Sequence, residues 1–177
     1  NKALELAREL EDFVSQKDAL LNIGLFHYFN EDYELSIPKL EEVYRLDEQL
    51  GDKTGMLGML NMIGMGYYYL HNTKEAIETL ERALDLSKKI GDEIKIERTM
   101  LSIAGVEKRE KNFTKAFKYY FSAKNIFEKE NSSEFLSNTL QALASTHYAK
   151  GDIDSAKIYS NRAFEIVEER GLSLIHI

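Results

Sequence analysis

The chain has 177 residues, 44% hydrophobic and 30% charged, which is enough for one domain and too apolar for a disordered protein. Its formal net charge of −7 argues against general binding to nucleic acid, and the absence of cysteine excludes disulfides, thiolate metal sites and cysteine nucleophiles. No uncharged apolar run reaches the roughly 18 residues of a membrane span, so we expect no contact with a membrane and a cytoplasmic protein.

Apolar residues recur at helical spacing along the whole chain, and a single proline, Pro38, interrupts it. The predicted helices are, in chain order, 1–12, 14–29, 34–50, 53–70, 74–90, 93–110, 114–129, 133–149 and 153–170. The fold class predicted from this pattern is all-α, with antiparallel helix hairpins.

The hairpins repeat with a period of 40 residues. Turn residues recur at Gly51, Gly91, Asn131 and Gly171. Small residues recur on the first helix of each hairpin, at Gly24, Gly64, Ala104 and Ala144, and on the second helix, at Ser36, Ala76, Ala116 and Ala156. Because a small side chain lets two helix backbones approach closely, these positions indicate contacts within each hairpin.

The segment from Asn61 to Leu70, followed by Ala76, Leu80 and Ala83, resembles a tetratricopeptide repeat. The resemblance implies a right-handed α-solenoid of repeats at 13–52, 53–92, 93–131 and 132–171. The 40-residue variant is similar to repeats of bacterial sensor and regulator proteins. Glu107 stands where the family has an aromatic residue, which puts the packing there in doubt.

Both ends of the chain depart from the repeat. Ala3 lies four periods before Ala163, so we expect 1–12 to be the second helix of a truncated preceding repeat. Residues 172–177 fit no repeat position and match the translation of a transposase adapter used in sequencing libraries. We therefore expect a metagenomic fragment whose last six residues are a non-native or disordered tail; a natural apolar tail is the alternative.

Nothing in the sequence predicts an enzyme, a metal site or a cofactor. His27 and His147 occupy the repeat position of Tyr67, which indicates packing rather than catalysis. The glycines of the second repeat follow no strand and precede no Gly-Lys-Ser/Thr motif, so helix packing explains them better than a phosphate loop. They are Gly55, Gly58, Gly64 and Gly66.

Seven carboxylates of the first two repeats fall on outward helix positions, where we expect a solvated face. They are Glu41, Glu42, Asp47, Glu48, Glu75, Glu78 and Glu81.

The resemblance implies a concave groove lined by the first helix of every hairpin. The groove residues it predicts are Asn22, Leu25, Tyr28, Phe29, Asn61, Met62, Met65, Tyr68, Tyr69, Arg98, Leu101, Lys108, Arg109, Asn138, Gln141 and Tyr148. Aromatic residues, Met and Arg are common in protein interfaces, and amides can pair with a peptide backbone. Several of these tyrosines could instead pack between repeats.

Charge is uneven along the chain. Residues 11–92 carry 16 acidic and 8 basic side chains, whereas 93–131 carry 6 acidic and 9 basic ones. We therefore expect a partner with an acidic segment near the third repeat, opposite Arg98, Lys108 and Arg109.

Two functions remain open at this point. The first is a module that binds a peptide or helix of a partner protein, as the sensory or scaffolding part of a larger bacterial signalling protein. The second is a structural spacer or homodimerisation arm for a missing effector domain, such as a histidine kinase or a DNA-binding regulator.

Overall fold

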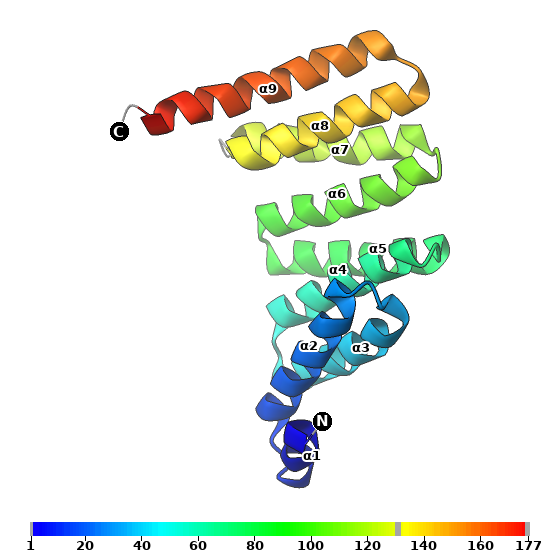
Figure 1. Ribbon diagram of the computed structural model, residues 1–177, viewed down its shortest axis with the longest axis vertical. Coiled ribbons are helices and arrows are strands. Elements are labelled where there is room, and N and C mark those ends of the chain that lie inside the picture. Colours follow the sequence, from blue (N-terminus) through cyan, green and yellow to red (C-terminus); the bar gives the residue numbers. More distant parts are fainter. Residues whose placement is uncertain (1, 130–131, 176–177) are drawn as a thin grey trace. The chain divides into compact units, whose positions relative to one another are not determined.

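The structure, a computed structural model, describes residues 2–129 and 132–175, and these residues contain nine helices and no strand (Figure 1). The chain divides into two compact units, Asn1–Gly91 and Asp92–Ile177. The helices of the first unit are α1 (Lys2–Glu9), α2 (Phe13–Phe29), α3 (Tyr33–Leu50), α4 (Lys53–Tyr69) and α5 (Thr73–Ile90). Those of the second are α6 (Glu93–Arg109), α7 (Phe113–Lys129), α8 (Ser133–Lys150) and α9 (Ile153–Ile175).

The predicted helices agree closely with the observed ones. From α2 to α8, no predicted end differs from the observed end by more than one residue. The first helix ends at Glu9 instead of residue 12, because Asp12 caps the next helix. The last helix continues to Ile175, beyond the predicted end at 170, and 176–177 lie outside the described residues. The adapter origin of 172–177 stays a prediction.

Aspartates 40 residues apart cap the first helix of successive hairpins. Asp12 accepts hydrogen bonds from the backbone N–H of Val14 and Ser15, both at 3.1 Å. The backbone N–H of Gly55 donates to Asp52 at 2.8 Å, and that of Lys95 donates to Asp92 at 3.1 Å. Each carboxylate satisfies an N–H that the helix leaves without an internal partner, so these positions fix where the helices begin.

The turns within and between hairpins use left-handed backbone at regular positions. Between hairpins, Gly51 and Gly91 have φ of 71° and 77° and end α3 and α5. Within hairpins, Gly151 has the same conformation, and its counterparts in the first three hairpins are the non-glycine residues Glu31, His71 and Lys111. A left-handed residue reverses the chain in a few residues, which brings consecutive helices together.

Small residues let the two helices of a hairpin approach. A Cβ added to Gly24 would lie 2.9 Å from Leu40, and one added to Gly64 would lie 2.7 Å from Leu80. Ser36 is buried and donates its hydroxyl hydrogen to the carbonyl of Gly24 at 2.8 Å. The small-residue series therefore serves the close packing that the sequence predicted, between α2 and α3 and between α4 and α5.

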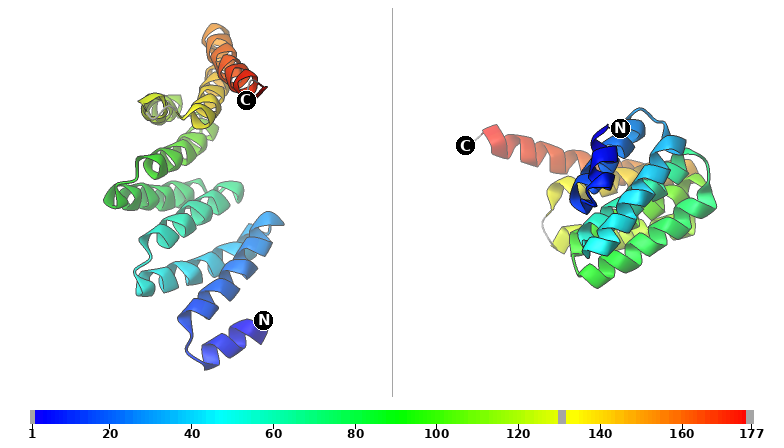
Figure 2. Two further views of the ribbon diagram at one scale, coloured as in Figure 1. Left: turned by 90° about the vertical axis from the view of Figure 1, so that its left-hand side faces the viewer. Right: turned by 90° about the horizontal axis from the view of Figure 1, so that it is seen from below.

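Each unit has its own hydrophobic core. In the first unit, buried residues of α1 to α4 form one cluster that includes Leu20, Leu40, Val43 and Ile63. In the second unit, α6 to α9 contribute Ala104, Tyr120, Leu143, Ala163 and other buried residues to a second cluster. Figure 2 shows α8 and α9 side by side in further views, as the last hairpin of this unit.

Candidate functional site

The predicted groove residues of the first unit lie on α2 and α4, and all of them are exposed or half-buried. Asn22 and Phe29 are exposed, Phe29 to 77%, while Leu25 is half-buried. On α4, the Asn61 amide donates to the carbonyl of Leu57 at 3.0 Å. Met62 packs against the core of the unit, and Met65 is half-buried. This surface therefore offers both apolar and amide groups.

Tyrosines at the ends of these helices pack against one another. Tyr33, at the start of α3, stacks on Tyr69 with ring centroids 4.8 Å apart and meets Tyr28 edge-on at 5.2 Å. Tyr68 meets Tyr69 at 5.2 Å. Burial, followed by the neighbouring Tyr69 and Tyr33 hydroxyls, raises the pKa of Tyr28 to about 12. Tyr69 thus packs between the first two hairpins, as the alternative interpretation had it, whereas Tyr28 packs within the first hairpin. Tyr69 still exposes 45% of its surface.

In the second unit, the cations on α6 differ in accessibility. Arg98 is exposed and lies over the ring of Phe135, 6.0 Å from its centroid. Lys108 donates to the Ser145 hydroxyl on α8 at 3.1 Å. The Arg109 side chain is only 25% exposed, and its Nε lies 4.0 Å from a Glu110 carboxylate oxygen. Arg98 and Lys108 are therefore better placed than Arg109 to meet a partner.

The polar residues predicted on α8 are exposed. Asn138, Gln141 and Tyr148 lie on one side of the helix, and Tyr148 is 69% exposed. Gln141 and Tyr148 also line an open cavity of about 590 Å³ between α8 and α9. Leu101, also predicted in the groove, is half-buried and packs against the core of this unit.

The prediction of a solvated carboxylate face is wrong for Asp47. Its side chain is 1% exposed, and Lys17 lies 2.5 Å from one of its carboxylate oxygens. The same ammonium also contacts Asp52 at 2.9 Å, so one cation bridges the buried carboxylate and the cap of α4. A signal existed in the sequence, because Lys17 occupies the repeat position of the buried Leu57, and Asp47 occupies that of the buried Ser87.

Two irregular repeat positions also have a structural explanation. Glu107, which replaces the expected aromatic residue, is 2% exposed and accepts hydrogen bonds from Asn112 at 2.8 Å and Lys115 at 3.2 Å. His147 stacks on Tyr159 with centroids 5.2 Å apart, and its Nδ1 lies 3.0 Å from Asp152. The predicted packing role of His147 is confirmed.

The structure explains three of the four glycines of α4. Side chains at Gly55, Gly64 and Gly66 would meet neighbouring side chains at 2.5, 2.7 and 3.1 Å, whereas a Cβ at Gly58 would enter open space. Within the described residues, no three His, Asp or Glu side chains gather as a metal site would require. Across 2–129 and 132–175, no helix is both long and apolar enough to span a bilayer.

Known proteins share this architecture. The tetratricopeptide repeat family model matches residues 17–89 and 95–169, which is more than half of the chain. No curated protein sequence matches the chain.

Solved structures share the fold at low sequence identity. BtubC from P. vanneervenii is 20% identical with a TM-score of 0.79, over 95% of this chain and 70% of BtubC. Aspartyl phosphate phosphatase F from Bacillus subtilis is 17% identical with a TM-score of 0.85, over 96% of this chain and 45% of the phosphatase.

A third similar structure is the Rap conjugation gene regulator of the plasmid pLS20 in complex with the Phr* peptide. It is 17% identical with a TM-score of 0.78, over 90% of this chain and 44% of the regulator. The chain thus spans less than half of the phosphatase and of the regulator. The predicted solenoid of antiparallel helix hairpins is confirmed, and the chain belongs to the tetratricopeptide repeat family.

Proposed function

We propose that this chain is a protein-interaction module that binds a peptide or helix of a partner through the first helices of its hairpins. The exposed first-helix surface carries the proposal. Asn138 and Gln141 are exposed, and their amides make no hydrogen bond within the described residues, so they are available to a peptide backbone. Phe29 and Tyr148 add exposed aromatic surface of the kind that anchors protein partners.

The similar regulator supports a peptide as the ligand, because that protein was solved with the Phr* peptide bound. Its role as a gene regulator also supports the bacterial signalling context that we propose for this chain. In this proposal the module recognises its partner and catalyses no reaction.

Selection from a displayed random peptide library on the immobilised protein tests the proposal. The affinity of a recovered peptide is then measured by calorimetry for the wild type and for Asn138→Ala with Gln141→Ala. Loss of two peptide hydrogen bonds should weaken binding about tenfold, or ~1.4 kcal/mol. The control is Asn125→Ala, an exposed amide on the second helix α7, which should bind as the wild type does. Recovery of no peptide, or equal effects of both changes, contradicts the proposal.

The partner segment should be acidic where it meets the second unit, because Arg98 and Lys108 present positive charge there. Arg98→Glu with Lys108→Glu should weaken binding of an acidic peptide and reduce the dependence of its affinity on salt. Lys118→Glu, an exposed charge reversal on α7, is the control. Equal salt dependence in the wild type and the double variant would remove this part of the proposal.

A second candidate, homodimerisation, rests on the apolar side chains of α9. Ile158 is 66% exposed, Phe164 62% and Val167 50%. Such residues in one stretch of helix favour an interface. Sedimentation equilibrium of the wild type and of Phe164→Glu tests this candidate: a dimer that the substitution dissociates supports it, and a monomeric wild type excludes it.

A further inference from the structure

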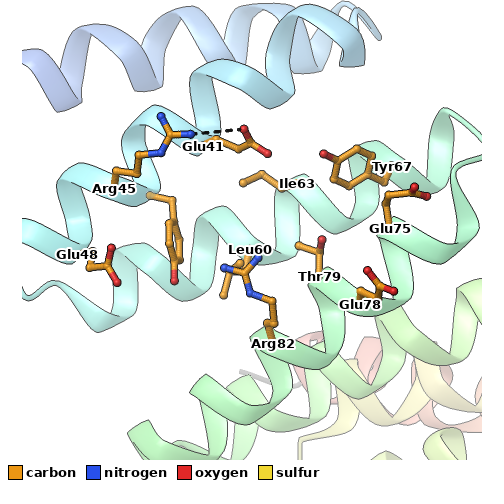
Figure 3. Close-up of a pocket in the computed structure, with 11 residues that line it drawn as sticks. Glu41, Arg45, Glu48, Leu60, Ile63, Tyr67, Glu75, Glu78, Thr79 and Arg82 are labelled. Carbon is orange, nitrogen blue, oxygen red and sulfur yellow. Dashed lines mark ion pairs between the residues drawn. The ribbon is translucent and has the colours of Figure 1, made fainter.

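The first unit contains a cavity of about 630 Å³ (Figure 3). The second helices α3 and α5 form its walls, and α4 forms its floor. Leu60, Ile63 and Tyr67 of α4 face it, whereas Asn61, Met65 and Tyr68 lie on the other side of the same helix. The cavity is therefore separate from the surface that carries the proposed function.

Carboxylates surround one end of this cavity. Glu41 projects from α3, while Glu75 and Glu78 project from α5 (Figure 3). The Tyr67 hydroxyl lies between them: burial raises the pKa of this tyrosine, and the charges of Glu41 and Glu75 raise it further. Three acidic side chains from two helices thus line a space with an apolar floor.

The two arginines of the cavity contact other residues that line it. Arg82 lies over the ring of Tyr44 at 5.6 Å, and Arg45 lies 4.0 Å from Glu41. Four glutamates and two arginines line the cavity, so the formal net charge of its lining is −2. The lining therefore favours a cation over an anion or a neutral molecule.

The side chain of a buried threonine points into the same space. Thr79 is 7% exposed, and Figure 3 shows its side chain directed to the cavity. Thr99, Thr139 and Thr146 donate their hydroxyl hydrogens to the carbonyl four residues earlier, at 2.7 to 2.9 Å. The Thr79 hydroxyl makes no such bond within the described part of the chain. A hydroxyl in a cavity wall that has no partner within the protein can form a hydrogen bond with a ligand.

We propose that this cavity binds an alkylammonium or alkylguanidinium group, the chemistry of a lysine or arginine side chain of a partner protein or of a free polyamine. The methylene stem contacts Leu60 and Ile63. The cationic head donates hydrogen bonds to the Glu41 and Glu75 carboxylates and to the Thr79 hydroxyl oxygen. Charge-assisted hydrogen bonds in a partly enclosed site are stronger than those between neutral groups. This proposal does not depend on the peptide surface of the first helices.

Methyl NMR of the full chain tests the proposal directly, because Ile63 and Thr79 carry methyl groups at the cavity. The probes are n-butylammonium, n-butylguanidinium and spermidine, with n-butanol as the neutral probe of equal stem length. Saturable shifts of these two methyl groups with the cations, and none with n-butanol, are expected. Absence of shifts with every cation, or equal shifts with n-butanol, overturns the proposal.

Variants locate the binding in the cavity. Glu75→Gln with Glu78→Gln should lower the affinity for the cation about tenfold, because charge-assisted hydrogen bonds contribute more than 1.4 kcal/mol. Glu81→Gln, an exposed change on the same helix outside the cavity, is the matched control and should leave affinity unchanged. Thr79→Val removes the hydroxyl at equal volume, and Ile63 then reports a weaker affinity. Wild-type affinity in both cavity variants overturns the proposal.

The relative affinities of the probes separate the two sources of the cation. Spermidine binding at least about tenfold tighter than n-butylammonium identifies a free polyamine as the ligand, because its additional ammonium groups then reach Glu41 and Glu78 together. Similar affinities identify a single side chain of a partner protein.

Discussion

At the scale of single residues, the ion pair between Lys17 and Asp47 is the least expected feature of the first unit. The Asp47 carboxylate is 1% exposed, and the Lys17 ammonium that neutralises it also reaches Asp52. A buried charge without its partner costs far more than the intact pair contributes. The equivalent positions of the second hairpin hold Leu57 and Ser87, which need no ion pair.

Lys17→Leu should therefore destabilise the chain by about 3 kcal/mol, because it leaves Asp47 charged and buried without a cation. Adding Asp47→Ser should recover most of this loss, since the pair then matches Leu57 and Ser87. Urea denaturation of the wild type and both variants measures the effect. If the double variant is no more stable than the single one, the ion pair is not the cause of the loss.

The glycines of α4 provide a matched pair at the same scale. Gly55→Ala should destabilise the chain, because its Cβ would lie 2.5 Å from the buried Asp47 carboxylate, which has no room to move. Gly58→Ala should stabilise it by about 0.5–1 kcal/mol, since alanine favours helix and its Cβ meets nothing within 4 Å. Thermal unfolding should show a lower Tm than the wild type for Gly55→Ala and a higher Tm for Gly58→Ala. Changes of the Tm in the same direction for both variants would contradict this account.

At the scale of the helix, aspartate caps make the start of several helices depend on pH. Asp12, Asp52, Asp92 and Asp152 have lowered pKa values. The largest cause of the lowered pKa of Asp12 and Asp152 is a hydrogen bond from the hydroxyl of the serine three residues later. For Asp92 the largest cause is a hydrogen bond from the Lys95 side chain, and for Asp52 it is one from the backbone N–H of Gly55. The folded chain therefore stabilises the ionised form of these carboxylates more than the unfolded chain does.

A lowered pKa in the folded state means that this stabilisation is present above the pKa of the unfolded aspartate, about 3.9, and is lost as the pH falls through the folded values. The Tm of the wild type should fall as the pH decreases below about 4. Changing the four caps to Asn keeps an acceptor for the helix N–H but removes the titration. Calorimetry across this pH range should give a smaller decrease for the Asn variant; equal decreases would contradict the assignment.

At the scale of the whole molecule, the 40-residue period predicts the helices because each boundary is marked several times along the chain. Asp12, Asp52 and Asp92 mark where first helices begin, and Gly51 and Gly91 mark where second helices end. One atypical residue then matters little, as Glu31 and His71 show at left-handed turn positions.

The buried charges and the cavity could not be predicted in the same way. A lysine at position 17 or a glutamate at position 107 departs from its counterparts in other hairpins, and a single departure does not distinguish a solvated side chain from a buried, neutralised one. The cavity depends on how α3, α4 and α5 approach one another, which no local pattern encodes. Likewise, the resemblance implied that Leu101 lines the groove, and only the structure shows that this residue also packs against the core of the second unit.

Repeat proteins unfold by segments because each hairpin contacts mainly its neighbours, and the two units here have separate cores. Lys17→Leu should therefore speed amide hydrogen exchange in α2 to α4 while α8 keeps its wild-type protection. Exchange followed by mass spectrometry on peptic fragments resolves these segments. Uniform acceleration over both units would show instead that they unfold as one.

The regular spacing of the turns also has a consequence for the gene. An in-frame duplication of one 40-residue segment would add a hairpin that carries its own cap, its own left-handed turn and its own small residues, so both new junctions would reproduce existing ones. Inserting a single residue inside a helix would instead rotate all following side chains of that helix by about 100° and misalign its buried face. Viable length variation in this lineage should therefore come in whole repeats.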